Sequence, residues 1–333
     1  MDAGLVVAVA LAAAFAVTNG LHDAANAIAA LVATRGASPK QAIVLASAFN
    51  LLGPLLLGAA VANTIGGIVT VDSAAADRVI AIALASAVIW NIGAWALGLP
   101  SSSGQALVGG LVGAEGGTQA VNWGGFHDGR PSGVLGSIVA LAISPPLGAL
   151  AALVLIRVLR RSSRRMTRQW RGQERAGQWA TAAALAFGHG ANDAQKSVGV
   201  VAALLLADGK INSLAAPTWV VVMCSSALTL GTALGGWKII RTVGRRIYRI
   251  GPLEGLASTG ASAVVIFGAS LLGAPTSTSQ VVASSVIGVG GGRRRWHHVR
   301  WQVVRRMGVA WLITLPATAA GAALLYSLWE VVT

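Results

Sequence analysis

Two aspartates lie in the middle of long apolar stretches, within segments that align with each other residue by residue. Asp23 belongs to the segment Asn19–Asn26, and Asp193 belongs to the segment His189–Lys196. A charged side chain at the centre of a membrane helix costs about 2.5–3.5 kcal/mol on insertion scales and therefore normally serves an ion or substrate path. The sequence predicts Asp23 and Asp193 as coupling-ion ligands. For Asp193 it leaves open a simple ion pair with Lys196, at helical spacing.

The residues beside these aspartates suit either transport or contacts between helices. His22 directly precedes Asp23 and could relay a proton or serve as a structural hydrogen-bond donor. Three amide side chains could bind substrate or join helices by hydrogen bonds: Asn26, Asn192 and Gln195. Gly20 and Gly190 predict that both helices unwind here and expose backbone carbonyls to a cation.

A second pair of aligned segments, Pro100–Gln105 and Pro275–Gln280, combines proline with hydroxyl side chains at the start of a short apolar run. Proline fits the first turn of a helix, hydroxyls cap that turn, and its unpaired N–H groups attract anions. We expect the two helix starts to meet tip to tip near the membrane midplane. The residues predicted to bind an anion here are Ser101, Ser102, Ser103, Gln105, Ser277, Thr278, Ser279 and Gln280.

The composition indicates a membrane protein. The chain has 333 residues, of which 55% are hydrophobic and 11% are charged, and its mean hydropathy is +0.68. Soluble domains carry about 25% charged residues, so a soluble or disordered protein is excluded. The net charge of +14 comes from basic clusters between apolar stretches, at 35–40, 157–175, 238–249 and 293–306. This distribution is typical of cytoplasmic loops and argues against nucleic-acid binding.

The apolar runs fall into two sets of similar outline. The long runs cover about 3–34, 41–62, 79–99 and 134–156 in the first set and 178–207, 215–237, 253–273 and 308–329 in the second. Runs at 101–114 and 276–290 are too short to cross a hydrocarbon layer of about 30 Å, so each is expected to form a re-entrant hairpin with the run before it. With the basic clusters in the cytoplasm, both termini lie outside.

We therefore predict an all-α polytopic membrane protein built from two inverted-topology repeats, each with broken helices and a re-entrant hairpin. The first repeat spans 1–156, a basic cytoplasmic linker spans 157–177, and the second repeat spans 178–333. Inverted repeats with paired helix interruptions are typical of secondary transporters. The sequence contains no nucleophile–base pair and no metal-ligand cluster with a known spacing. We therefore predict no enzymatic activity, and we assign no resident cofactor and no metal site.

At these motifs the sequence resembles the PiT family of inorganic phosphate transporters. The paired segments around Asp23 and Asp193 look like that family's signature, and the resemblance covers essentially the whole chain, including both hydroxyl-rich hairpins. It implies a homodimeric carrier that moves phosphate together with a cation. By position, the resemblance implies that Asp23, Asn26, Asn192 and Asp193 hold the coupling ion or phosphate, and that the hairpin hydroxyls bind phosphate oxygens.

One departure from the family pattern bears on the coupling ion. Many members have Asn before Asp in both repeats, as at Asn192, whereas this chain has His22 in the first repeat. A histidine removes an oxygen ligand from a sodium site, and a buried carboxylate can bind a proton instead. The sequence therefore favours proton over sodium coupling, and it resembles the bacterial low-affinity branch, which is associated with metal–phosphate uptake into the cell across the cytoplasmic membrane.

The residues alone leave other cargoes and mechanisms open. Sulfate has the same shape as phosphate, and a sulfate permease of the same family is the nearest alternative. Phosphate near pH 7 also donates hydrogen bonds, so its site needs an acceptor, for which Asp23, Asp193, Gln105 and Gln280 are candidates. An anion channel is an alternative of a different class, but it would need neither buried carboxylates nor two occluding hairpins.

Overall fold

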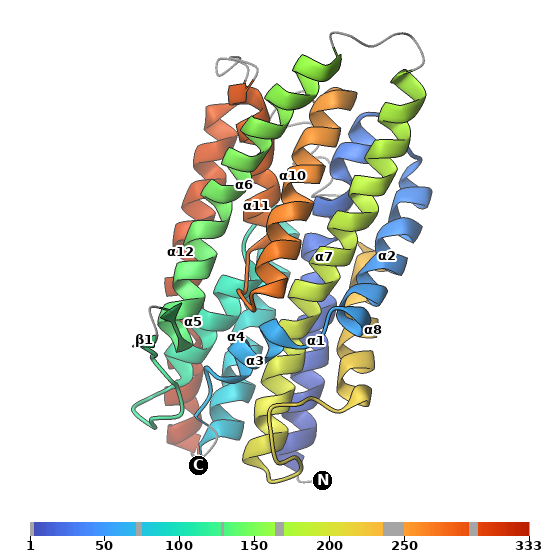
Figure 1. Cartoon of the computed structure of the whole chain (residues 1–333). Helices are drawn as coiled ribbons and strands as arrows, with labels where there is room; N and C mark the ends of the chain where they lie inside the picture. The colour runs from blue at the N-terminus through green and yellow to red at the C-terminus, as the bar shows by residue number, and fades with distance from the viewer. Residues whose placement is uncertain are drawn as a thin grey trace.

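The computed structural model describes residues 3–70, 75–127, 130–163, 170–235, 250–292 and 299–332, and the described chain is a helical bundle (Figure 1). A pair of two-residue antiparallel strands, β1 (Phe126–His127) and β2 (Arg130–Pro131), precedes α6. The helices are α1 (Ala3–Ala33), α2 (Pro39–Leu56), α3 (Ala60–Gly66), α4 (Ala76–Leu97), α5 (Ser103–Ala114), α6 (Gly133–Ser163), α7 (Trp170–Ala207), α8 (Thr218–Leu234), α10 (Pro252–Leu271), α11 (Thr278–Gly292) and α12 (Trp301–Val332).

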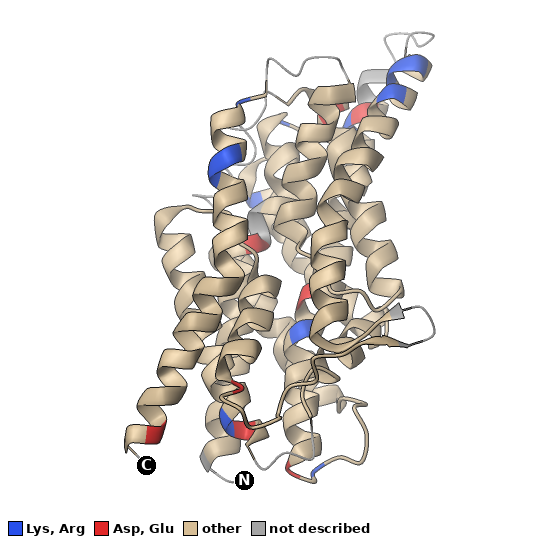
Figure 2. Ribbon diagram, turned by 90° about the vertical axis from the view of Figure 1, so that its left-hand side faces the viewer, with Lys and Arg blue, Asp and Glu red and all other residues tan. Residues whose placement is uncertain are grey.

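Among the described helices, α1, α4, α6, α10 and α12 are long and apolar enough to cross a membrane, and the bent pair α2–α3 could make a sixth span. Both termini lie at one end of the bundle (Figure 1). The end of α6 and the start of α7 lie at the opposite end, where basic side chains gather (Figure 2). The predicted basic cluster at 238–249 lies outside the described residues, as does the part at 293–298 of the cluster at 293–306.

The first re-entrant hairpin consists of α4 and α5. Arg78, near the start of α4, donates a hydrogen bond to the Tyr326 hydroxyl of α12 over 3.2 Å, and Gly116, just after α5, packs against the same ring. The hairpin therefore begins and ends at the same end of the bundle, beside the C-terminus. Gly98 turns the chain after α4 with a φ of 65°, a conformation that favours glycine.

The second re-entrant hairpin consists of α10 and α11 and opens at the other end of the bundle. Pro252 O, at the start of α10, accepts a hydrogen bond from Gln178 near the start of α7 over 2.9 Å. At the end of α11, Gly292 lies against Leu153 in the last part of α6. Gly273 follows α10 with a φ of 70°, in the same role as the glycine after α4. Both predicted hairpins are thus confirmed.

Glycines allow the long helices to cross at very short range. An added Cβ at Gly20 of α1 would lie 2.1 Å from Leu228 O of α8, and one at Gly231 of α8 would lie 2.0 Å from Val17 O of α1. The crossing of α2 and α7 is built in the same way: a Cβ at Gly190 would lie 2.2 Å from Asn50 O. Small residues thus let backbones approach, as in membrane helix packing generally.

The prediction that helices unwind at Gly20 and Gly190 is wrong. Both α1 and α7 run without interruption through these glycines, so the backbone carbonyls stay within the helical hydrogen-bond pattern. The physical reason is the crossing just described, because a glycine in a membrane helix serves close packing as readily as it serves a break.

Two further details differ from the sequence prediction. The apolar run at 41–62 is not one straight crossing, because α2 ends at Leu56 and α3 follows at an angle of 75°. In addition, Pro100 and Pro275 do not occupy the first turns of the hairpin helices. They lie in the turns that precede α5 and α11, which begin at Ser103 and Thr278.

Candidate functional site

The tips of the two hairpins meet in the middle of the bundle, as the sequence predicts. Ser279 Oγ in the first turn of α11 donates a hydrogen bond to Ser101 O, just before α5, over 2.8 Å. Gln280 Nε2 donates to Gln105 Oε1 over 3.0 Å, which joins the first turns of the two helices. The starts of α5 and α11, each with its positive dipole end and free first-turn N–H groups, are thereby brought side by side.

Asp23 of α1 is held at the start of α5. Its Oδ2 accepts a hydrogen bond from Ser103 Oγ over 3.1 Å, and its Oδ1 accepts one from Asn26 Nδ2 over 2.9 Å. The Nδ1 atom of His22 lies 3.3 Å from the same Oδ1. The side chain is 2% exposed, so this carboxylate is surrounded by protein and contacts neutral donors and one imidazole.

Asp193 of α7 has the matching place at the start of α11. Its Oδ2 accepts a hydrogen bond from Thr278 Oγ1 over 3.0 Å and lies 2.9 Å from His189 Nε2. Its Oδ1 forms an ion pair with the ammonium of Lys196, one helical turn further along α7. The ion pair that the sequence left open is therefore present, and it coexists with the contact to the hairpin.

The two carboxylates share several equivalent contacts. Residues that occupy the same position in the aligned segments make the same contact: Ser103 and Thr278 donate to the carboxylates, and Asn26 and Lys196 donate from one turn along.

The residues just before the two aspartates, His22 and Asn192, also make equivalent contacts. Each contacts the turn before the hairpin helix, so that His22 Nε2 lies 2.9 Å from Leu99 O and Asn192 Nδ2 donates to Ala274 O over 3.2 Å. The sequence repeat thus corresponds to a repeat of contacts.

His189 bridges the second carboxylate to α2. Asn50 Nδ2 donates to Thr232 Oγ1 of α8 over 3.0 Å, which turns Asn50 Oδ1 toward His189 Nδ1 at the same distance. An amide oxygen can only accept, so Nδ1 of the imidazole must be the donor. The lone pair of Nε2 in a neutral ring then faces Asp193 Oδ2, and this contact is short without being aligned as a hydrogen bond.

His22 is arranged in a similar way. Leu99 O can only accept, so its 2.9 Å contact favours a proton on Nε2 of His22 over the longer 3.4 Å approach of the Ser101 amide to the same nitrogen. A neutral ring then presents its Nδ1 lone pair to Asp23 Oδ1. One added proton would turn this contact, and the one between His189 and Asp193, from a meeting of lone pairs into a charge-assisted hydrogen bond. Each carboxylate therefore has a position suited to binding a proton.

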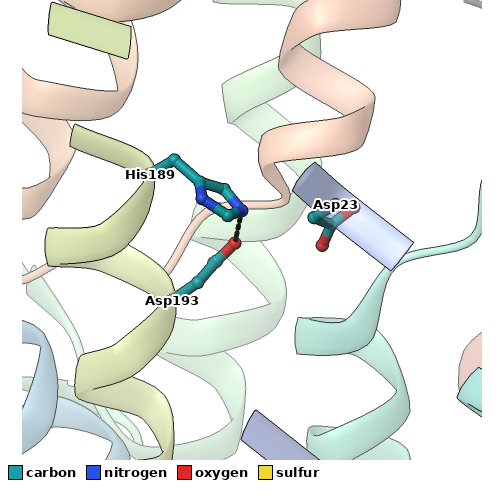
Figure 3. Close-up of side chains that lie close together, drawn as sticks. All are labelled: Asp23, His189 and Asp193. Carbon is teal, nitrogen blue, oxygen red and sulfur yellow. Dashed lines mark ion pairs between the residues drawn. The ribbon is translucent and has the colours of Figure 1, made fainter. Parts of the chain in front are cut away.

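The two carboxylates also converge on one another. Ligand atoms of Asp23, His189 and Asp193 all lie within 4.8 Å of each other, and all three side chains are buried. In Figure 3 the Asp23 carboxylate points from α1 toward the His189–Asp193 pair on α7. A nitrogen and two carboxylates at this range could hold a cation between α1 and α7.

Other predicted residues hold the framework. Gln195 points to the break between α2 and α3, where its Oε1 accepts from the amide of Val61 (2.9 Å) and its Nε2 donates to Gly58 O (2.6 Å). Ser102 caps α5 by accepting a hydrogen bond from the Gln105 amide over 3.2 Å. Ser277 Oγ lies 3.4 Å from Ser279 Oγ at the tip of the second hairpin.

Three residues that the sequence did not predict belong to the hydrogen-bond network of the site: Asn19, Asn50 and Thr232. Asn19 Oδ1 accepts from Ser103 Oγ over 2.8 Å, and its Nδ2 is buried with no partner among the described residues. Asn26 Oδ1, also buried, has no partner within the same ranges. Asn19 could have been found by its place in the aligned segment opposite His189, and Asn50 as an amide side chain in the middle of an apolar run.

Comparison with known proteins finds relatives over nearly the whole chain. A model of the phosphate transporter family matches residues 19–176 and 162–322. The chain is 39% identical over 327 residues to a probable low-affinity inorganic phosphate transporter of Rhizobium meliloti (strain 1021), covering 97% of this chain and 95% of that protein. It is 38% identical over 323 residues to a protein of the same description from Bacillus subtilis (strain 168), covering 95% and 94%.

A solved structure described as the sodium-dependent phosphate transporter has the same fold, with a TM-score of 0.85 and 23% identity over the full length of both chains. The matched proteins are transporters and not enzymes, as the sequence indicates for this chain. Together with the apolar helices, the matches identify a multi-pass membrane protein that belongs to the phosphate transporter family.

Proposed function

We propose that this protein imports inorganic phosphate across the cytoplasmic membrane by symport with a cation. The observation that carries the proposal is the paired site in which each hairpin helix begins at a buried carboxylate. Ser103 and Thr278 join Asp23 and Asp193 to the starts of α5 and α11. Anion-binding helix starts and cation-binding carboxylates are thus linked by single hydrogen bonds, so occupancy of one affects the other.

Phosphate would bind between the two hairpin tips. The first-turn N–H groups and hydroxyls of α5 and α11 can donate to its oxygens, and the Gln105–Gln280 pair can separate to offer amide groups. The proposed phosphate ligands are Ser101, Ser102, Ser103, Gln105, Ser277, Thr278, Ser279, Gln280, Asn26 and Asn192. Hydroxyls of this set bond to one another and to the carboxylates, so the proposed phosphate ligands are close together.

Coupling follows from charge. An anion that enters between two buried carboxylates meets repulsion that water does not screen, because the side chains of Asp23 and Asp193 are 2% and 0% exposed. Lys196 compensates one of these carboxylates, and the other needs a cation from solution. A proton between His22 Nδ1 and Asp23 Oδ1 would supply that charge, so we favour proton coupling.

Sodium is the second candidate for the coupling ion. Its support is the oxygen set around Asp23, since Asn26 Oδ1 is buried without a partner in the described part of the chain, and Asn19 Oδ1 accepts from the same Ser103 hydroxyl that contacts Asp23. Sodium prefers such hard oxygen ligands. The continuous helix at Gly20 removes the exposed backbone carbonyls that would have completed a sodium cage, which supports the proton.

The cargo could also be phosphate complexed with a divalent metal. The support is the group formed by Asp23, His189 and Asp193, whose ligand atoms lie within 4.8 Å of one another beside the proposed phosphate position. The metal would travel as part of the substrate. Uptake of radiolabelled phosphate with and without magnesium or zinc, followed by measurement of metal inside the vesicles, tests this directly.

We also propose that residues 1–156 and 178–333 form two inverted repeats joined by the linker 157–177, with both termini outside the cell. The equivalent contacts around Asp23 and Asp193 support the repeat, and the basic ends of α6 and α7 opposite the termini support the orientation (Figure 2). The family resemblance further implies a homodimer, which light scattering of the purified protein would test.

The deciding experiment is uptake of radiolabelled phosphate into proteoliposomes. We expect accumulation against the phosphate gradient when a pH gradient is imposed in sodium-free choline buffer, and stronger competition by arsenate than by sulfate. A channel would only equilibrate phosphate. Uptake that collapses in choline and ignores the pH gradient would show sodium coupling, and stronger competition by sulfate would contradict phosphate as the cargo.

A further inference from the structure

The two halves of the site differ in one charged group. Aligned positions around the carboxylates carry matching contacts, but the residue one turn after the aspartate is the neutral Asn26 in α1 and the cationic Lys196 in α7. Both donate to the Oδ1 atom of their aspartate. The ammonium of Lys196 therefore occupies, beside Asp193, the position that an amide occupies beside Asp23.

Lys196 is fixed in this position from several sides. Its side chain is 0% exposed, and its Nζ donates to Thr276 O, in the turn before α11, over 2.7 Å in addition to pairing with Asp193. A Cβ at Gly104, in the first turn of α5, would lie 3.3 Å from the same Nζ. The ammonium therefore lies where the two hairpins and α7 meet, within the proposed anion site.

We infer that Lys196 is a tethered cation that replaces a coupling cation in the second half of the site, leaving only the Asp23 half to take one from solution. The inference rests on the proposed symport of phosphate. A buried carboxylate needs a compensating charge, and a covalently attached one cannot leave with the substrate. The protein would therefore move one cation fewer with each phosphate than a protein whose two carboxylates both bind free ions.

The reversal potential of phosphate uptake measures this number. Proteoliposomes are loaded with radiolabelled phosphate and given a fixed gradient of the coupling cation, and the membrane potential at which net flux vanishes gives the cations carried per phosphate. The substitution Lys196→Asn gives Asp193 the same neutral neighbour that Asp23 has in Asn26. We expect the stoichiometry to rise by one cation, with a lower apparent affinity for that cation.

The matched control is Lys210→Asn, which removes a 54% exposed lysine side chain outside the site and should leave the stoichiometry unchanged. An unchanged stoichiometry in active Lys196→Asn would overturn the inference. Failure of the wild-type protein to accumulate phosphate under any cation gradient would instead overturn the proposed function itself. The two failures are therefore distinguishable.

Asn26→Lys is the reciprocal variant, and it keeps the inference testable if Lys196→Asn does not assemble. It places an ammonium beside Asp23, so phosphate counterflow between the two sides of the vesicle should no longer depend on the concentration of the coupling cation, which is varied through the pH for protons and by exchange of sodium for choline for sodium. Counterflow that still requires the cation at the wild-type concentration would overturn the inference. Thermal unfolding in sodium chloride and in choline chloride, at two pH values, gives the same comparison without transport, because each lost cation site removes one ligand-dependent stabilisation.

Discussion

The substitution Gly20→Ala tests whether the glycines beside the aspartates serve close packing. The new Cβ would lie 2.1 Å from Leu228 O and 2.9 Å from Thr232 N, whereas ordinary contact begins at 3.4 Å. Alanine gains about 1 kcal/mol over glycine in a helix, but overpacking costs about 1–3 kcal/mol and more where rigid backbone must move. Because both obstacles are backbone atoms of α8, we expect overpacking to prevail and the free energy of unfolding to fall by about 1–3 kcal/mol.

The matched control is Gly93→Ala in α4, where an added Cβ meets nothing within 4 Å. Helix propensity alone should then raise stability by up to about 1 kcal/mol. Thermal unfolding of the purified variants in one detergent measures both, and phosphate uptake reports whether displacement of α1 disturbs Asp23. Equal or greater stability of Gly20→Ala would refute the packing argument and favour a helix that opens at this glycine.

Three other predictions concern the site and its framework. Asp23→Asn and Asp193→Asn should each abolish coupled phosphate uptake while the protein stays folded in the membrane, and near-normal uptake by both would contradict their role. Ser102→Ala and Ser277→Ala should each raise the half-saturating phosphate concentration by a factor equivalent to about 1–3 kcal/mol, and Ser102→Ala should also lower stability by about 1 kcal/mol because it removes the cap of α5. Gln195→Ala should lower unfolding stability by about 1–3 kcal/mol because it strands buried backbone groups at the α2–α3 break, and a changed phosphate affinity instead would place Gln195 in the anion site.

Features that are costly in a membrane could be predicted from the sequence. Asp23 and Asp193 stand out because few charges occur in the apolar runs, and a charge there needs a partner or a task. The hairpins follow from length, since runs at 101–114 and 276–290 cannot cross and must return. Their meeting at the tips follows from the aligned motifs, and the hydrogen bonds from Ser279 and Gln280 confirm it.

Features decided by the neighbouring helix could not be predicted in the same way. From the sequence, Gly20 could mark either a break in the helix or a point where two helices cross. Only its close approach to Leu228 of α8 shows that it marks a crossing. The bend between α2 and α3 depends on Gln195, which is distant in sequence and satisfies backbone groups freed at the bend. The same holds for Asn50, whose bond to His189 is set by tertiary packing.

In the proposed symport, the two aspartates need not do the same work. A cation that binds at Asp23 turns a buried negative charge into a neutral pair, which lowers the cost of burying it and of bringing an anion close. A cation added at Asp193 would leave an excess positive charge, because Lys196 already neutralises this carboxylate. Binding of a cation at Asp23 can therefore precede binding of phosphate. Binding of a cation at Asp193 would be favourable only when phosphate is already bound. Among the differences between the two halves, the exchange of Asn26 for Lys196 would therefore be the one that orders the binding of cation and anion.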